Sequence, residues 1–193
     1  AELRELADEA LTDEARAADS SGLVAATWEV TSGGHSALVF CSSKFKCERA
    51  AELLAEWLPE APSEATHKAA RAALVEEMRK QANGVDATLV KTLPRGVAFH
   101  HSGLTTEERG MIERSYTAGA ISVICATSTL AAGVNLPARR VIFNTPYMGN
   151  AFLDATQYRQ MAGRAGRAGQ GTIGESILIA TPKQLQQALE LVA

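Results

Sequence analysis

Two arginines, Arg164 and Arg167, stand three residues apart in the run 160–167, and Gly163 and Gly166 flank Arg164. Residues three apart share one face of a helical turn, and the glycines let a phosphate or another backbone approach closely. Guanidinium groups are planar, permanently charged and bidentate, so the pair suits the charge that builds on a transferring phosphoryl group. A helix end with glycine stops and cations that favour the dipole has the same pattern, so both readings remain open.

Hydroxyl side chains follow two short apolar stretches, residues 37–41 and 121–126, which have the composition of strands buried on both faces. The hydroxyl residues after these stretches are Ser42, Ser43, Thr127 and Ser128. Open α/β sheets bind ligands at the carboxyl ends of their parallel strands, so we expect these oxygens at one edge, placed to meet an anion. Capping of the next helix is the alternative use of a serine at such a position.

His100 and His101 follow a third expected strand, residues 97–99. Neighbouring side chains on a strand point to opposite faces, so the two rings are not expected to chelate one ion. We expect one ring to be packed or hydrogen-bonded in the core and the other to face a cleft. The four histidines and three cysteines of the chain show no metal-ligand spacing, so no metal site is predicted.

The elements that must position these residues alternate between apolar strands and helices, which predicts an α/β fold with an open, mostly parallel sheet and helices on both faces. The expected strands are residues 37–41, 97–99, 121–126, 141–144 and 172–180, and the main helices cover 22–30, 44–58, 64–81 and 105–118 and begin again at 154 and 183. Residues 1–20 are interpreted as an N-terminal helical arm and 21–193 as one domain. A stretch at about 59–93 carries no chemical motif and is interpreted as a helical insertion.

Composition limits the partners of the chain. The net charge is -3 and the sequence pI is about 5.9, so the overall basic field of a non-specific nucleic-acid binder is absent and any phosphate contact must be local. Cys41 and Cys125 lie in apolar runs and are expected to be buried thiols. No apolar run approaches the roughly 20 residues that span a bilayer, and no signal peptide opens the chain, which predicts a soluble intracellular protein.

Four segments taken together resemble the second RecA-like motor domain of superfamily-2 helicases. They are the strand ending Phe40-Cys41-Ser42-Ser43, the segment His100–Leu104, the segment Ala126–Arg140, and the run Gln160–Arg167. Their order and spacing are most similar to the DNA-repair branch that contains the helicase part of DNA polymerase theta and its stand-alone helicase relatives. The resemblance covers roughly residues 22 to 182 and implies a RecA-like fold in an ATP-dependent DNA helicase of the nucleus.

The resemblance also implies roles for individual residues. In such motors ATP lies between two RecA-like domains, and the first domain holds its phosphates and Mg²⁺. Arg167 would be the arginine finger, with Arg164 beside it and Gln160 near the attacking water. Gly133 and Asn135 would line the same cleft. The phosphates of single-stranded or forked DNA would be held by neutral donors from Thr127, Ser128, Ser42, Ser43 and His101.

The segment 145–152 mixes turn residues with apolar ones, which indicates a hairpin or a wedge. In the same branch a strand-separating hairpin lies at this point of the chain. Tyr147, Met148 and Phe152 would then form its apolar wedge against the last base pair. A surface loop whose apolar residues pack inward is the alternative.

One expected motif is missing, because the sequence contains no G-x-x-x-x-G-K-[ST] loop. The chain alone is therefore not expected to hydrolyse ATP, and a first RecA-like domain must come from the same polypeptide or from a partner. A catalytically inert RecA-like scaffolding module and an RNA helicase motor domain are the alternative functions. The motor interpretation further expects the arginines and the hydroxyls to emerge from the same edge of one parallel sheet.

Overall fold

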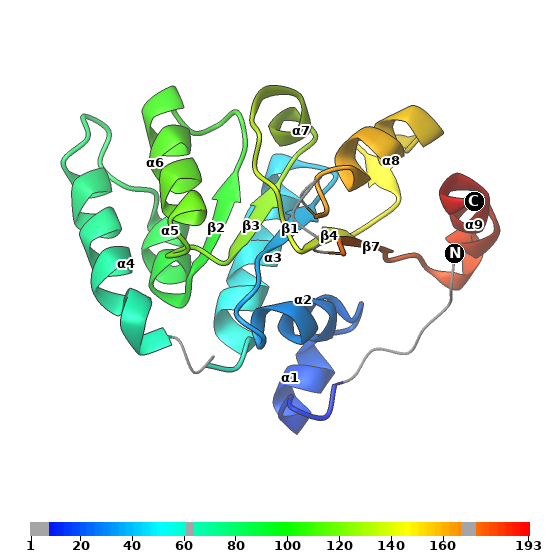
Figure 1. Ribbon diagram of the computed structural model, residues 1–193, viewed down its shortest axis with the longest axis horizontal. Helices are drawn as coiled ribbons and strands as arrows, with labels where there is room; N and C mark the ends of the chain where they lie inside the picture. The colour runs from blue at the N-terminus through cyan, green and yellow to red at the C-terminus, as the bar shows by residue number, and fades with distance from the viewer. Residues whose placement is uncertain (1–7, 61–63, 167–172) are drawn as a thin grey trace.

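The computed structural model describes residues 8–60, 64–166 and 173–193. Its core is a five-stranded sheet in which every neighbouring pair is parallel, in the order β2-β3-β1-β4-β7. The strands are β1 (Ala37–Phe40), β2 (Val97–His100), β3 (Val123–Ala126), β4 (Arg140–Phe143) and β7 (Glu175–Leu178). Helices flank this sheet (Figure 1), which confirms the predicted α/β, RecA-like fold.

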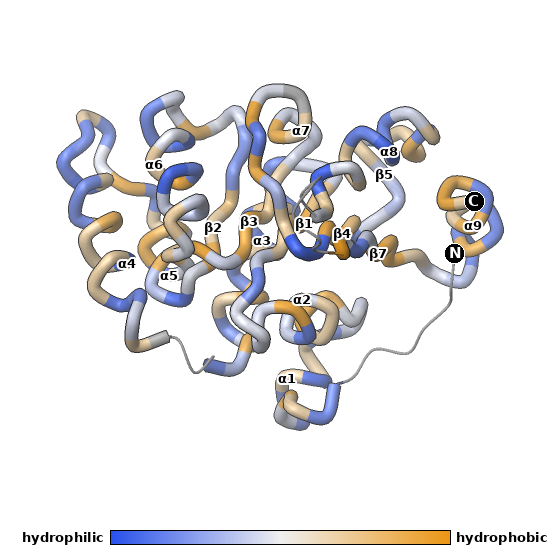
Figure 2. Tube along the Cα trace, in the orientation of Figure 1, coloured by the Kyte–Doolittle hydropathy of each residue, from blue (hydrophilic) through white to orange (hydrophobic). Residues whose placement is uncertain are grey.

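The strands form where they do because their residues are almost all apolar. All four residues are buried in each of β1, β2, β3 and β4, and the tube in Figure 2 is mainly orange along β1 and β3. Phe40 and Phe143 meet across neighbouring strands with ring centroids 5.7 Å apart. Burial of such side chains is the main stabilising contribution to the sheet.

Helices alternate with the strands along the chain. They are α1 (Asp13–Ala18), α2 (Leu23–Thr31), α3 (Lys44–Trp57), α4 (Glu64–Arg79), α5 (Ala87–Thr92), α6 (Thr106–Thr117), α7 (Thr129–Gly133), α8 (Ala155–Ala162) and α9 (Leu185–Val192), with 3-10 turns η1 (Leu93–Arg95) and η2 (Pro182–Gln184). The two helices that matter most for the site have clear starts: Ser43 caps α3, and Asp154 with Gln157 forms a capping box on α8. No helix in the described part of the chain is both long and apolar enough to cross a membrane.

Two stretches that the predicted domain organisation sets apart contact the core. Within residues 8–20 the helix is Asp13–Ala18, and Leu11 and Ala15 are buried in the core. The stretch 59–93 is also tied to the core, because the buried Arg71 of α4 donates its Nε–H to the carbonyl of Ala120 at 2.7 Å. A buried arginine needs such partners, so α4 is held against the strand-bearing part of the fold.

The register aligns the carboxyl ends of the central strands. Phe40 of β1 pairs with Ala126 of β3 and with Phe143 of β4, and His100 of β2 also pairs with Ala126. The residues that follow these strands therefore start from one edge of the sheet. In Figure 1 this edge faces upward, and α7 and α8 lie above it.

Candidate nucleotide and nucleic-acid interface

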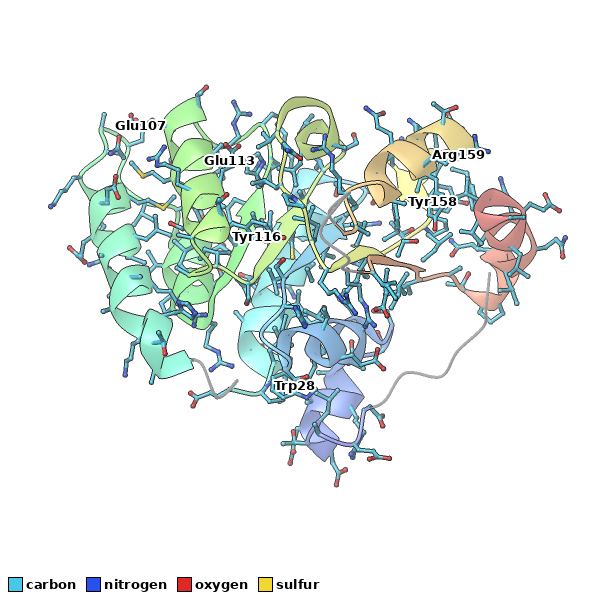
Figure 3. All side chains as sticks on the ribbon, viewed as in Figure 1. Trp28, Glu107, Glu113, Tyr116, Tyr158 and Arg159 are labelled. Atoms are coloured by element: carbon cyan, nitrogen blue, oxygen red, sulfur yellow. The ribbon has the colours of Figure 1, made fainter. Side chains whose placement is uncertain are left out.

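Helix α8 leads into the arginine run, and one aromatic side chain, that of Tyr158, anchors it to the sheet. The Tyr158 ring packs on Phe143 with centroids 4.9 Å apart, and its hydroxyl is 2.9 Å from the Ser176 hydroxyl of β7. Figure 3 labels Tyr158 and its neighbour Arg159 on α8, and Arg159 is exposed. The buried side of α8 thus fixes where the chain enters residues 163–166.

Arg164 turns its guanidinium toward α7. Its two Nη groups donate hydrogen bonds to the carbonyl oxygens of Ala131 and Val134, which lie at the end of α7 and just after it. These bonds use two of the five N–H donors of a guanidinium, so further donors remain. Arg164 forms no ion pair with a described acidic side chain.

The segment 164–166 is bonded to the chain that leads into β4. Ala138 N–H donates to the Arg164 carbonyl at 3.0 Å, and Gly166 N–H donates to the Ala138 carbonyl at 2.7 Å. Gly174 comes so close that a Cβ built on it would lie 2.2 Å from the Ala165 carbonyl carbon. Arg167, the expected finger, lies outside the described residues.

A cavity of about 930 Å³ opens beside Arg164. Asn135, Arg139 and Arg164 contribute polar side chains to its wall, and none of the described residues that line it is an aspartate or a glutamate. This lining suits an anion such as a polyphosphate. Gln160 and Gly133 are exposed but do not line the cavity. The described residues also contain no group of three or more acidic, histidine or cysteine side chains that could hold a metal ion.

The cavity lies at the amino-terminal side of the sheet. Its wall includes Ser36, Ser122 and Arg139, which immediately precede β1, β3 and β4. The expected hydroxyls follow the strands and lie at the opposite edge, whereas Arg164 lines this cavity and also reaches, with its guanidinium, the Ala131 and Val134 carbonyls beyond the carboxyl end of β3. The reason is the return path 134–139, which leads from the carboxyl end of β3 to the amino end of β4, and Arg164 is bonded beside it.

The four hydroxyl residues at the carboxyl edge differ in exposure and in hydrogen bonding. Ser43 Oγ accepts a hydrogen bond from Lys46 N–H at 3.2 Å as the cap of α3. Ser42 is 9% exposed. Thr127 is half-buried with its Oγ1 3.0 Å from Thr129 Oγ1, and Ser128 is exposed and makes no side-chain cap bond. Ser128 is therefore the most exposed of the four residues, and Thr127 and Ser43 are half-buried.

The two histidines point to opposite faces of the sheet, as the strand geometry predicts. His100 Nε2 lies 2.8 Å from Glu113 of α6, and His101 Nε2 lies 2.9 Å from Glu48 of α3. Each histidine is only 4% exposed, so the expectation that one of them faces a cleft is wrong. The Nδ1 of His101 accepts from Gly103 N–H at 3.0 Å, so both of its ring nitrogens are engaged and no free one remains for a DNA phosphate.

A hairpin forms between residues 147 and 152. Its strands are β5 (Tyr147–Met148) and β6 (Ala151–Phe152), paired antiparallel. The Tyr147 and Phe152 rings meet edge to face with centroids 5.2 Å apart, while Met148 packs against the core. Gly149 and Asn150 form the exposed turn, and Gly149 N–H donates to the Ser42 carbonyl at 2.8 Å. The hairpin therefore stands beside the hydroxyl edge.

Three residues near this site were not singled out by the sequence analysis. Arg140 is 4% exposed and pairs with Glu29 at 2.8 Å and with Glu175 at 2.5 Å. Arg139 lines the cavity. For the two arginines, the sequence did offer a signal, namely an arginine pair at the start of an apolar strand. An arginine that is buried at such a position requires acidic partners. The glycine at 174 offered no such signal.

Comparison with known proteins identifies the family. A family model described as helicase conserved C-terminal domain matches residues 64–169, a range that includes α4 and α5. The chain is 46% identical over 182 residues to the human protein named Helicase POLQ-like, covering 94% of this chain and 16% of that protein. It is 39% identical over 187 residues to mouse DNA polymerase theta, covering 90% of this chain and 7% of the relative.

A third relative extends the comparison. The ATP-dependent DNA helicase Hel308 of Caldivirga maquilingensis is 39% identical over 168 residues, with 83% of this chain and 22% of that protein covered. The chain thus spans less than a quarter of the length of each of these relatives. The matched family, the parallel sheet and the order of the four segments agree, and the chain belongs to the helicase conserved C-terminal domain family.

Proposed function

We propose that this chain is the second motor domain of an ATP-dependent DNA helicase of the DNA-repair type, located in the nucleus. The cavity carries most of this proposal, because Asn135 and Arg164 both line it and no described lining residue is acidic. The relatives named as helicases support the same assignment. We use the term complete motor for this chain together with a P-loop domain, on one polypeptide or on two.

On the nucleotide side, the chain supplies positive charge and hydrogen-bond donors. ATP provides the phosphoryl group whose transfer to water releases the free energy for movement. Arg167 stabilises the charge that develops on this group, and Gln160 orients water beside it. Arg164 holds the end of α7 through the Ala131 and Val134 carbonyls and keeps its remaining donors for a phosphate. Gly133 and Asn135 line the cleft between the two domains, Asn135 on the wall of the cavity and Gly133 outside it, and the first domain holds Mg²⁺.

On the DNA side, the hydroxyl edge grips the backbone. Thr127 and Ser128 donate to phosphates, with Ser42 and Ser43 beside them, which suits a chain whose net charge is -3. His101 acts indirectly, because its ring fixes the turn at Gly103 and its bond to Glu48 ties that turn to α3. Nucleotide and DNA then contact different residues of this chain, so both can be bound at the same time.

The hairpin supplies the wedge for strand separation. Tyr147 and Phe152 form an aromatic pair beside the hydroxyl edge, with Met148 as its support in the core. An aromatic face can stack on the last base pair of a fork. Deletion of residues 147–152 from the complete motor should abolish unwinding and spare DNA-stimulated ATP hydrolysis, and an intact unwinding rate would contradict the wedge.

The test of this function uses the complete motor and the isolated chain side by side. The complete motor should hydrolyse ATP faster when single-stranded DNA is added, and the isolated chain should not turn over ATP. Thr127→Val should weaken DNA binding, while Thr66→Val on the exposed surface of α4 should leave it unchanged. A complete motor without DNA-stimulated turnover would favour the inert scaffold, and stimulation by RNA alone would favour an RNA motor.

A further inference from the structure

Arg139 and Arg140 are neighbours in sequence with opposite surroundings. The guanidinium of Arg140 is buried and bonded to Glu29, to Glu175 and to the Ala26 carbonyl. The guanidinium of Arg139 is half-exposed on the cavity wall. It forms no hydrogen bond or ion pair with any residue in the ranges 8–60, 64–166 and 173–193.

The backbone of Arg139 is held on both sides. Its N–H donates to the Ser36 carbonyl at 3.0 Å, and its carbonyl accepts from Glu175 N–H at 3.0 Å. These bonds tie Arg139 to the entrances of β1 and β7. The Cβ position is therefore fixed and only the side chain must be ordered by a ligand, which reduces the entropic cost of binding.

None of the described residues that line the cavity around Arg139 is acidic. Among its described lining residues the charged side chains are Arg139 and Arg164, and the Arg164 guanidinium already donates to two carbonyls. A half-exposed arginine with no described side-chain partner, in a cavity of about 930 Å³ with no described acidic lining residue, is suited to bind an anion of the size of a nucleotide. A guanidinium binds phosphate, as it binds carboxylate, in bidentate fashion, and phosphate is the anionic part of a nucleotide.

We propose that Arg139 is a further nucleotide-binding residue, which contacts a phosphate of ATP from the strand-entrance side of the cavity. This inference rests on the proposed function and adds a cation to those that the arginine run provides. Arg140 then has a separate task, because it neutralises Glu29 and Glu175 and so keeps their charge from opposing Arg139.

The test measures equilibrium binding of a non-hydrolysable ATP analogue to the complete motor. Arg139→Ala should raise the Kd by about 10- to 100-fold, the range expected for loss of a hydrogen bond to a charged group. The Kd of Arg139→Lys should lie between the Kd of Arg139→Ala and that of the wild type, because a lysine keeps the charge without the bidentate geometry. The control is Arg79→Ala, which removes an exposed arginine of α4 that pairs with Glu76, and its Kd should not change.

The outcomes separate the two proposals. If the wild-type complete motor does not bind the analogue, the proposed function fails and this inference fails with it. If the wild type binds and Arg139→Ala matches Arg79→Ala, only the inference is overturned. A loss of DNA affinity at unchanged nucleotide Kd also overturns it, because the phosphate would then belong to the nucleic acid. Should Arg139→Ala unfold, Arg139→Gln retains the side-chain length and carries the same comparison.

Discussion

The guanidinium of Arg164 donates a hydrogen bond to the carbonyl oxygen of Val134, the residue before Asn135. Arg164 follows α8, and Val134 follows α7, so this bond joins the two segments that carry the expected nucleotide-cleft residues. The second bond, to the Ala131 carbonyl, holds the last turn of α7. A displacement of α8 must therefore move Asn135 as well, which gives the cleft one connected wall.

Removal of the Arg164 guanidinium should destabilise this wall. Arg164→Ala leaves the Ala131 and Val134 carbonyls without their donor, and we expect a loss of about 1.5–3 kcal/mol in the free energy of unfolding. Chemical denaturation of the purified chain measures it. Arg159→Ala removes an exposed arginine of α8, the helix that precedes Arg164, and should change little. Equal stabilities of the two variants would contradict a stabilising role of the Arg164 guanidinium.

Arg140 is predicted to be a structural arginine. Arg140→Met leaves Glu29 without its arginine in a largely buried place, since only 16% of the Glu29 side chain is exposed. Breaking one partner out of a buried pair costs about 3–5 kcal/mol, so we expect a loss of that size in unfolding free energy. Arg139→Ala should cost far less, because its side chain has no described partner. Similar losses in both variants would refute the division of roles.

Alanine substitutions at Gly174 and Gly133 can be compared, because the two glycines differ in the space around an added Cβ. A Cβ at Gly174 would meet the backbone of Ala165 and Gly166 at 2.2 to 2.3 Å, which only a shift of the backbone can relieve. Gly174→Ala should destabilise the chain by about 1–3 kcal/mol and reduce ATP turnover by displacing residues 164–166. Nothing lies within 4 Å of a Cβ at Gly133, so Gly133→Ala should fold normally. Thermal unfolding of both variants is the measurement, and a normal Gly174→Ala protein would disprove the close approach.

His100 should make stability depend on pH. Burial lowers the pKa of His100 below its usual 6.5, with a smaller contribution from the charge of Arg109, although the contact with Glu113 opposes this shift. The unfolded chain therefore takes up this proton first, and stability should fall as the pH drops below about 6.5. His100→Phe should reduce this slope between pH 7.5 and 5.5, measured by denaturant unfolding. An unchanged slope would show that the imidazole does not contribute.

The fold could be predicted from the sequence because apolar strands alternate with helices. The family could be predicted from the four segments. Positions of Ser42 and Thr127 at one edge followed from strand polarity alone, because parallel strands end on the same side. The location of Arg164 did not follow, since it depends on the return path 134–139, and no local pattern encodes which side of a sheet a connecting segment passes. The burial of His101 was missed for the same reason, because its partner Glu48 is 53 residues away in sequence.

The most direct measurement is the maximal rate of ATP hydrolysis by the complete motor carrying Arg167→Ala, at saturating single-stranded DNA and Mg-ATP. If this chain supplies the arginine finger, the rate should fall by about 10³-fold or more, as for other motors that lose this group, while Arg159→Ala keeps the wild-type rate. An Arg167→Ala motor that turns over ATP at the wild-type rate would contradict the account and leave the chain as a scaffold.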